Sequence, residues 1–288
     1  FYIFLLALTL TGVAAQTIDS VAIKQVDSLI KVSRALTEKN DFDKAFEVNA
    51  VAEKIALEKL RKESAAYGSS CFNRGRIAYY KNDYPEAEKW YLESKDIREK
   101  YLGKAHPDYV ATLNNLASLY VKMLKYEKAE LLYIEANAIR EKVLGKEHPD
   151  YAGNLINLAL LYDGMGQFEK VEPLYLKAKE IFEGSNNLKH PYYINCLNNL
   201  ATLYHSMGQF EKAEPLYLES IAIGKKTLGK EHLDYAGRLN NLAVLYTDMD
   251  QYEKAEPLYL EAKAIREKAL GKEHPDYASC LNNLASLY

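Results

Sequence analysis

The chain has 288 residues, of which 48% are hydrophobic and 27% are charged, a balance typical of a folded protein rather than a disordered one. Its net charge is −3 with both signs interleaved, so it lacks the basic field with which proteins attract nucleic acid. Gly (14) and Pro (8) are few, whereas Ala, Leu, Glu and Lys are abundant, which favours helix over strand. We therefore expect a helical protein that does not bind nucleic acid.

The N-terminal segment, residues 1–15, is almost wholly apolar and carries no charge. It ends in Val-Ala-Ala before Gln16, which fits the small-residue rule of a signal-peptidase site. A membrane helix needs about 20 apolar residues, so this run is short for a span. We interpret it as a cleaved export signal, with an uncleaved anchor and a buried helix as alternatives. The chain is expected to be exported, to the periplasm or the extracellular space of a bacterium, with no other membrane association.

The three cysteines are an odd number, which argues against a disulfide framework. Cys196 and Cys280 lie 84 residues apart at the same place in their repeats, so stacked helices would hold them too far apart to bond. Both are expected to be free thiols. Cys71 is expected to be a small core residue.

The main feature of the sequence is a 42-residue repeat, marked by recurring His-Pro-Asp-Tyr strings that begin at residues 106, 148, 190, 232 and 274, with substitutions at 192 and 233. The repeats run over 64–105, 106–147, 148–189, 190–231 and 232–273, with a partial copy at 274–288. Residues 16–63 are expected to form a degenerate helix pair, because Phe42 and Ala45 match Tyr84 and Ala87. A fixed period of this size indicates stacked supersecondary units that bury their apolar faces against one another.

Each unit is predicted to be a pair of helices. In the first helix Leu155, Leu158, Ala159 and Tyr162 follow the i, i+3, i+4, i+7 spacing of an apolar helical stripe. The tight turn to the second helix is centred on one position, filled in successive units by Asn40, Asn82, Leu124, Gly166, Gly208 and Asp250. All of these except the leucine tolerate left-handed backbone. The second helix is expected to end at Gly103, Gly145, Asn187, Gly229 and Gly271.

Leu116-Ala117-x-x-Tyr120, followed by Ala129-x-x-x-Tyr133, resembles the tetratricopeptide signature, although Ala replaces the usual Gly and the period exceeds about 34 residues. The strings over 198–204 and 213–217 are similar to the long repeats of kinesin light chains. The resemblance covers about 64–288. It implies an all-α fold, a right-handed α-solenoid of antiparallel helix pairs, whose concave groove binds extended peptide segments. It does not imply a motor-protein role.

The leading candidate for a binding site is a column of asparagines at one position of six successive units. Its members are Asn73, Asn115, Asn157, Asn199, Asn241 and Asn283; a second, incomplete column consists of Asn114, Asn198, Asn240 and Asn282. Asn is a poor residue for a helix interior, and this position lies nearly opposite the apolar stripe. Its amide offers both a donor and an acceptor for a peptide backbone, as the matching asparagines of kinesin-light-chain-like repeats are expected to do. The alternative is that these amides tie neighbouring repeats together.

Two variable columns of the first helix are expected to set specificity in the groove. One contains Arg76, Ser118, Leu160, Thr202, Val244 and Ser286; the other contains Tyr80, Lys122, Gly164, Ser206 and Asp248. Neither has a uniform charge, so an extended peptide of mixed sequence is a better ligand than a charged homopolymer. The tyrosines at 91, 133, 175, 217 and 259 recur in core phase and are predicted to be packing residues.

Metal binding and catalysis are not expected. The His-Pro-Asp loops contain ligand residue types, but the set changes between copies, and helix capping explains it better. The string Gly224-x-x-x-x-Gly229-Lys230 has Glu231 where a phosphate loop needs Ser or Thr. No nucleophile elbow, zinc-protease motif or paired-cysteine motif is present. No cofactor is therefore assigned.

The sequence thus predicts a non-enzymatic scaffold that binds a peptide or a partner protein. The main alternative is a sensor or regulatory arm of a longer protein with a C-terminal effector domain, for example a caspase-like one, as in similar bacterial arrays. A third interpretation is a purely architectural spacer, which predicts no peptide partner.

Overall fold

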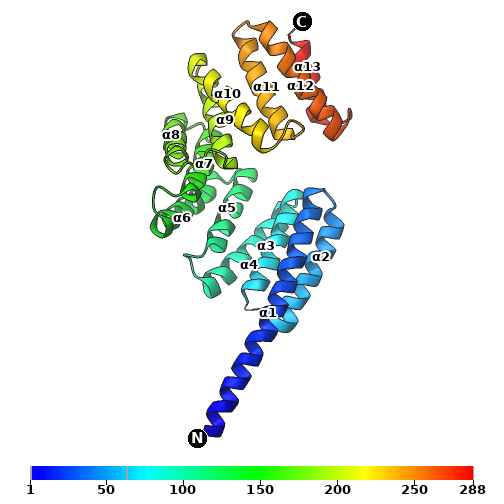
Figure 1. Cartoon of the computed structure of the whole chain (residues 1–288), viewed down its shortest axis with the longest axis vertical. Helices are drawn as coiled ribbons and strands as arrows, with labels where there is room; N and C mark the ends of the chain where they lie inside the picture. Colours follow the sequence, from blue (N-terminus) through cyan, green and yellow to red (C-terminus); the bar gives the residue numbers. More distant parts are fainter. Residues whose placement is uncertain (1, 63, 288) are drawn as a thin grey trace. The chain divides into compact units, whose positions relative to one another are not determined.

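The computed structural model describes residues 2–62 and 64–287, with side chains from residue 20 onwards. Every regular element in these ranges is a helix, and successive helices pack as pairs (Figure 1). The all-α class and the stacking of helix pairs predicted from the sequence are confirmed.

The first helices of the pairs are α1 (Tyr2–Glu38), α3 (Ala65–Tyr80), α5 (Pro107–Lys122), α7 (Pro149–Gly164), α9 (Pro191–Ser206), α11 (Leu233–Asp248) and α13 (Pro275–Ala285). The second helices are α2 (Phe42–Ile55), extended by the π-helical turn η1 (Ala56–Leu60), then α4 (Tyr84–Leu102), α6 (Tyr126–Leu144), α8 (Phe168–Gly184), α10 (Phe210–Thr227) and α12 (Tyr252–Leu270).

The chain divides into two compact units, an N-terminal unit of residues 1–143 and a C-terminal unit of residues 144–288. In the N-terminal unit α1, α2, η1 and α3 pack together, and α4 packs on both α3 and α5. In the C-terminal unit α8, α10 and α12 each pack between the first helix of their own pair and the first helix of the next. Each unit is therefore a stack in which neighbouring pairs share a core.

Histidines cap the first helices of five successive pairs. In each case the imidazole Nδ1 accepts a hydrogen bond of 3.1–3.2 Å from the backbone N–H two residues later. These residues are His106, His148, His190, His232 and His274. A proline follows as the first helical residue in all copies but the fourth, where Leu233 takes its place. The capping interpretation of the His-Pro-Asp loops is confirmed, because a side-chain acceptor satisfies one of the four free N–H groups of each helix end.

The turns between the two helices of a pair adopt left-handed backbone at the predicted position in all six helix pairs. Their φ angles lie between 57° and 70° at Asn40, Asn82, Leu124, Gly166, Gly208 and Asp250. Leu124 has φ 57° although leucine pays a steric cost there, and its side chain is 71% exposed.

The predicted ends of the second helices are correct at four of five positions. Gly103 and Gly271 have φ near 80° and ψ of 161° and 169°, a region that only glycine enters readily. The prediction for Asn187 was wrong, because Asn186 has the positive φ instead, at 54°. The reason is that α8 ends early, at Gly184, where the Ser185 hydroxyl donates to the carbonyl of Ile181.

The core consists of small residues at the helix crossings and of the recurring tyrosines. Ala117 and Ala129 are fully buried. The predicted packing tyrosines are also buried, with at most 4% exposure at residues 91, 133, 175, 217 and 259. All three cysteines are buried free thiols, as expected.

The proposed cleavage point after residue 15 lies where the structure describes no side chains, so the export signal remains a prediction from the sequence. In the part of the chain that is described, no helix has the length and apolar character needed to cross a membrane.

Candidate functional site

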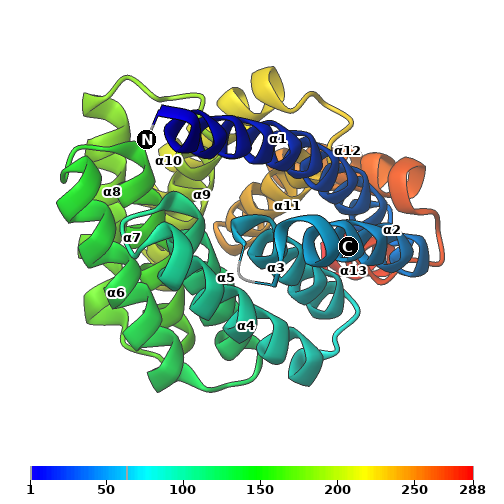
Figure 2. The ribbon, with the colours of Figure 1, turned by 90° about the horizontal axis from the view of Figure 1, so that it is seen from below.

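The first helices of the C-terminal unit contact one another directly: α7 meets α9, and α9 meets α11. The second helices α8, α10 and α12 lie outside them, as Figure 2 shows. In a curved stack of helix pairs, the helices of the inner layer lie closer to one another than those of the outer layer. The first helices of this unit therefore form its inner layer. The residues that α7, α9 and α11 expose on this side form what we call the inner face of the C-terminal unit.

Polar side chains connect α9 to α11 in three places along the inner face. The Arg238 guanidinium donates to Asn195 Oδ1 at 2.7 Å, and the Asn241 amide donates to Asn198 Oδ1 at 3.3 Å. His205 Nε2 lies 2.6 Å from the Asp248 carboxylate. All three pairs are 43 residues apart, one more than the repeat. They form successive rungs of one ladder, which fixes the two inner helices side by side.

The same ladder continues between α11 and α13, where the Asn283 amide donates to Asn240 Oδ1 at 2.8 Å. Here a member of the first asparagine column again bonds to a member of the second column in the preceding repeat. In the C-terminal unit, therefore, both columns lie on the inner face, and part of their hydrogen-bonding capacity connects neighbouring repeats.

In the N-terminal unit the predicted asparagines lie in different surroundings. Asn73 is fully buried, and its amide donates to Ser33 Oγ at 2.8 Å and to Asn49 Oδ1 at 3.1 Å. It therefore connects α3 to α1 and α2, which is the role given above as the alternative. Asn115 is half-buried, and its amide donates to the carbonyl of Ala111, one turn earlier in its own helix.

The remaining members of the columns are at least partly accessible. Asn282 is exposed, whereas half-buried side chains are found at Asn114, Asn157, Asn198, Asn199, Asn240, Asn241 and Asn283. These accessible amides, together with their variable neighbours, are the residues that could meet a ligand.

The core tyrosines take part in the site through their hydroxyl groups, although they were predicted only as packing residues. In two repeats the first variable column carries a hydroxyl that bonds to the tyrosine of its own repeat. Thr202 Oγ1 lies 2.9 Å from Tyr217 Oη. In the N-terminal unit Ser118 Oγ lies 2.8 Å from Tyr133 Oη. The signal was present in the sequence as a hydroxyl residue fifteen positions before the tyrosine.

Leu160 breaks this pattern, because an aliphatic side chain cannot bond to the tyrosine of its repeat. Tyr175 instead lines a cavity together with Asn199 of the next repeat. Burial raises the pKa of Tyr175, and the negative charge of Asp163 raises it further. Tyr175 therefore stays a neutral group at the floor of the inner face between α7 and α9.

A cavity of about 240 Å³ opens at this place between α7 and α9. It is lined by Leu160, Asp163, Phe168, Tyr175, Asn199, Thr202, Leu203 and Ser206. The set includes one asparagine of the predicted site and three residues of the two variable columns. Leu160 is 46% exposed and Phe168 is 57% exposed, so two large apolar side chains stand open beside amide, hydroxyl and carboxylate groups. Such a lining suits an amphipathic side chain of a ligand.

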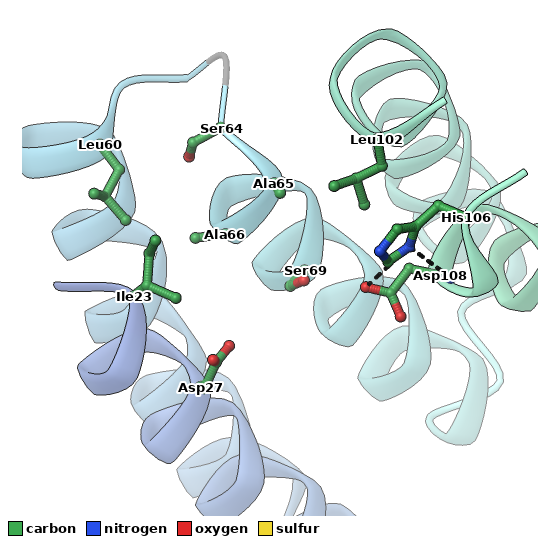
Figure 3. A pocket seen from close by; sticks show the side chains of 10 residues that line it. All are labelled: Ile23, Asp27, Leu60, Ser64, Ala65, Ala66, Ser69, Leu102, His106 and Asp108. Atoms are coloured by element: carbon green, nitrogen blue, oxygen red, sulfur yellow. Dashed lines mark hydrogen bonds and ion pairs between the residues drawn. The ribbon is translucent and has the colours of Figure 1, made fainter. Parts of the chain in front are cut away.

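A second cavity, of about 360 Å³, lies within the N-terminal unit, between the middle of α1 and the first turns of α3 and α5 (Figure 3). Asp27 of α1, Ser69 of α3 and Asp108 of α5 face it, with apolar walls from Ile23 and Leu102.

The polar groups around this second cavity serve the fold. The Ser69 hydroxyl and the Asp108 carbonyl accept hydrogen bonds from the buried guanidinium of Arg98, at 3.3 and 2.9 Å. Burial lowers the pKa of Arg98 to about 10. Because His106 caps α5, its Nδ1 is also engaged. The cavity between α7 and α9 is therefore the better candidate.

Sequence and structure comparisons identify the family. Models described as tetratricopeptide repeat match residues 64–142, 125–184, 165–226 and 193–243 in one case and residues 236–276 in another. The chain belongs to the tetratricopeptide repeat family. No similar protein was found among curated sequences.

Solved structures show the same fold, and several of them are kinesin-light-chain-like tetratricopeptide proteins. TPR-like repeats of a Podosopora anserina kinesin light chain are 26% identical, with a TM-score of 0.57 over 72% of this chain and 99% of that one. BtubC (BKLC) of P. vanneervenii is 22% identical, with a TM-score of 0.61 over 88% and 94% of the two chains. NprR, a quorum sensor of B. thuringiensis, solved in complex with its cognate peptide NprX, is 18% identical, with a TM-score of 0.55 over 91% and 78%.

Proposed function

We propose that this chain is a protein-binding scaffold that holds an extended peptide segment of a partner on the inner face of its C-terminal unit. The observation that carries the proposal is the cavity between α7 and α9, where the exposed side chains of Leu160 and Phe168 stand beside Asn199 and Thr202. Apolar side chains give a peptide affinity through the burial of its own apolar groups, and amides bond to its backbone whatever its sequence.

The family and its structural neighbours support the proposal. Tetratricopeptide repeats are typically non-catalytic protein-binding modules, and the structurally similar NprR was solved with its cognate peptide. The polar ladder between α9 and α11 supports it in a second way. Because the ladder keeps α9 and α11 in register, the amides on these two helices are in place before the ligand arrives, which lowers the entropy cost of binding.

Selection from a random displayed-peptide library, followed by calorimetry of the enriched peptides, tests the proposal. Leu160→Asn is expected to weaken an enriched peptide at least tenfold, because it replaces the apolar wall with an uncharged amide. Leu218→Asn on α10 is the matched control, since both leucines are 46% exposed but Leu218 lies on a second helix. Its affinity should stay within twofold of the wild type. Equal losses in both variants, with unchanged circular dichroism, would contradict binding on the inner face.

We also propose, from the sequence alone, that residues 1–15 direct export and are removed. N-terminal sequencing of the secreted protein is expected to begin at Gln16. Recovery of the intact apolar segment in a membrane fraction would contradict cleavage.

A further inference from the structure

Asp163 on α7 stands at the position that His205 occupies one repeat later. His205 contacts the following first helix, whereas the carboxylate of Asp163 makes no such contact among the described residues. Between α9 and α11 this contact joins His205 to Asp248, at 2.6 Å. The equivalent positions of α7 and α9 hold Asp163 and Ser206, and none of the described residues that line the cavity between them is basic. Over the described residues, we find no hydrogen bond or ion pair for the Asp163 side chain. Ser206 donates its hydroxyl to the carbonyl of Leu203 in its own helix.

The surroundings of Asp163 favour a positively charged ligand group. None of α7, α9, α11 and α13 contains a lysine, and their single arginine, Arg238, is committed to Asn195. The lysines of the C-terminal unit lie on second helices and loops instead. Over residues 144–288 there are 20 Asp and Glu against 15 Lys and Arg, so the wider field of this unit is also acidic.

The cavity beside Asp163 has the size and lining for one long side chain. Its volume of about 240 Å³ lies below the ~300 Å³ at which pockets for small-molecule ligands begin. Leu160 and Phe168 provide an apolar wall for a methylene chain, and the ring of Phe168 is open to a cation. The hydroxyl of Thr202 and the carboxylate of Asp163 then offer acceptors at the polar edge.

We propose that this cavity binds a lysine or arginine side chain of the peptide held on the inner face, with the methylene chain against Leu160 and Phe168 and the cation on the Asp163 carboxylate. The inference rests on the proposed function, because it names the chemistry that the peptide must present at one position. It makes Asp163 a residue that determines specificity, whereas the asparagines contact the backbone and do not discriminate between sequences.

The test uses nonapeptide pools that are degenerate at eight positions and carry lysine, norleucine or glutamate at the centre. Norleucine keeps the methylene chain and removes the charge. The purified wild-type chain is expected to bind the lysine pool about fivefold more tightly than the norleucine pool, the size of a well-placed pair at a partly exposed site. The glutamate pool should bind more weakly still. The preference for lysine should decline as salt is raised, because partly exposed charges are screened.

Two variants isolate the role of Asp163. Asp163→Asn is expected to abolish the difference between the lysine and norleucine pools, whereas Glu169→Gln, which removes an equal charge one residue beyond Phe168, should preserve it. An unchanged preference in Asp163→Asn, or no preference in the wild type, would overturn the inference and leave the peptide-binding function standing. If every pool binds Leu160→Asn as tightly as it binds the wild type, both fail. Displacement of the lysine pool by equimolar spermidine would show a site for small cations rather than for a peptide side chain, and would also overturn the inference.

Discussion

The hydroxyl of Tyr204, on the first helix of one repeat, donates a hydrogen bond of 2.8 Å to Glu172 on the second helix of the preceding repeat. Lys212, on the second helix of the same repeat as Tyr204, places its ammonium group 5.0 Å from the ring centroid. The same three-residue contact recurs one repeat later with Tyr246, Glu214 and Lys254, and in the N-terminal unit with Tyr120, Glu88 and Lys128. This contact is a recurring polar connection between neighbouring repeats, in addition to their shared apolar core.

Tyr204→Phe is expected to lower the free energy of unfolding by about 2 kcal/mol. The substitution keeps the ring and its packing but leaves the half-buried Glu172 carboxylate without its donor, and hydrogen bonds to charged groups contribute about 1.5–3 kcal/mol. Urea unfolding followed by circular dichroism measures the change. Tyr252→Phe is the control, since its hydroxyl bonds only to Asp250 within an exposed turn. A loss below ~0.5 kcal/mol is expected there, and equal losses would show that the contact between repeats adds nothing.

The same contacts predict a loss of stability at alkaline pH. Burial, then the hydrogen bond from the hydroxyl to glutamate and the charge of that glutamate, raise the pKa of Tyr120, Tyr204 and Tyr246 to about 12. An unfolded tyrosine has a pKa near 10. Since the folded pKa is the higher one, the contribution to stability is fully present below pH 10 and is lost as pH rises from about 10 to about 12.

Ultraviolet titration of tyrosinate in the wild type and in Tyr204→Phe checks this prediction. The difference between the two curves is expected to have its midpoint near pH 12, or at the pH where the chain unfolds if that comes first. Glu172→Gln should shift the midpoint of Tyr204 towards 10, because it removes the negative charge beside the hydroxyl. A midpoint of 10 in the folded wild type would contradict the contact.

The features that the sequence predicted correctly depend on residues close together in the chain. A histidine that caps α5 bonds two residues ahead, and the turn at Gly166 needs only its own backbone freedom. Both signals repeat every 42 residues, which made them easy to recognise. The exception, Asn187, shows the limit of this reasoning. The helix α8 ends at Gly184 and Asn186 has the positive φ, so the place of an asparagine in the repeat did not fix the residue at which the helix stops.

The candidate site was only partly predictable, since its contacts join side chains that are 43 residues apart. The repeat places Asn198 and Asn241 in adjacent columns, but which amide reaches which helix depends on the crossing geometry of α9 and α11. Likewise, the composition of α7 and α9 shows that Asp163 has no nearby lysine, but only the structure shows that Leu160 and Phe168 open beside it.

Leu124 offers a test of backbone strain at the turn between α5 and α6. Its φ of 57° costs leucine about 1–2 kcal/mol, whereas asparagine, found at this position in two other turns, visits this conformation readily. Leu124→Asn is therefore expected to stabilise the chain by about 1 kcal/mol in urea unfolding, because the exposed leucine side chain loses little burial. Leu131→Asn is the control: Leu131 is 70% exposed but lies inside α6, where asparagine is the poorer helix former, so a small loss is expected. A loss in Leu124→Asn would show that the leucine side chain packs usefully.

At three junctions a guanidinium lies between the end of one second helix and the start of the next first helix, and it comes from the second helix in two of them and from the first helix in the third. In the N-terminal unit Arg98 donates to Thr112, fourteen residues later, at 2.8 Å. In the C-terminal unit Arg266 likewise reaches Cys280. At the junction between α10 and α11 the arrangement is reversed, because Gly224 has no side chain and Arg238 extends from α11 into its place. A Cβ added at Gly224 would lie 3.7 Å from the Arg238 side chain.

Exchanging these two residues should therefore be better tolerated than changing either one. Gly224→Arg alone crowds two guanidinium groups into one buried space, and Arg238→Thr alone leaves a void and an unpaired Asn195; each is expected to cost about 1–3 kcal/mol. The double variant recreates the arrangement of Arg98 with Thr112, so its loss should be at least 1 kcal/mol smaller than the sum of the single losses in urea unfolding. Gly164→Arg combined with Arg238→Thr is the control, because nothing lies within 4 Å of a Cβ at Gly164. That pair should be additive within about 0.5 kcal/mol, and additivity in the Gly224 pair as well would mean that the two positions do not share one guanidinium site.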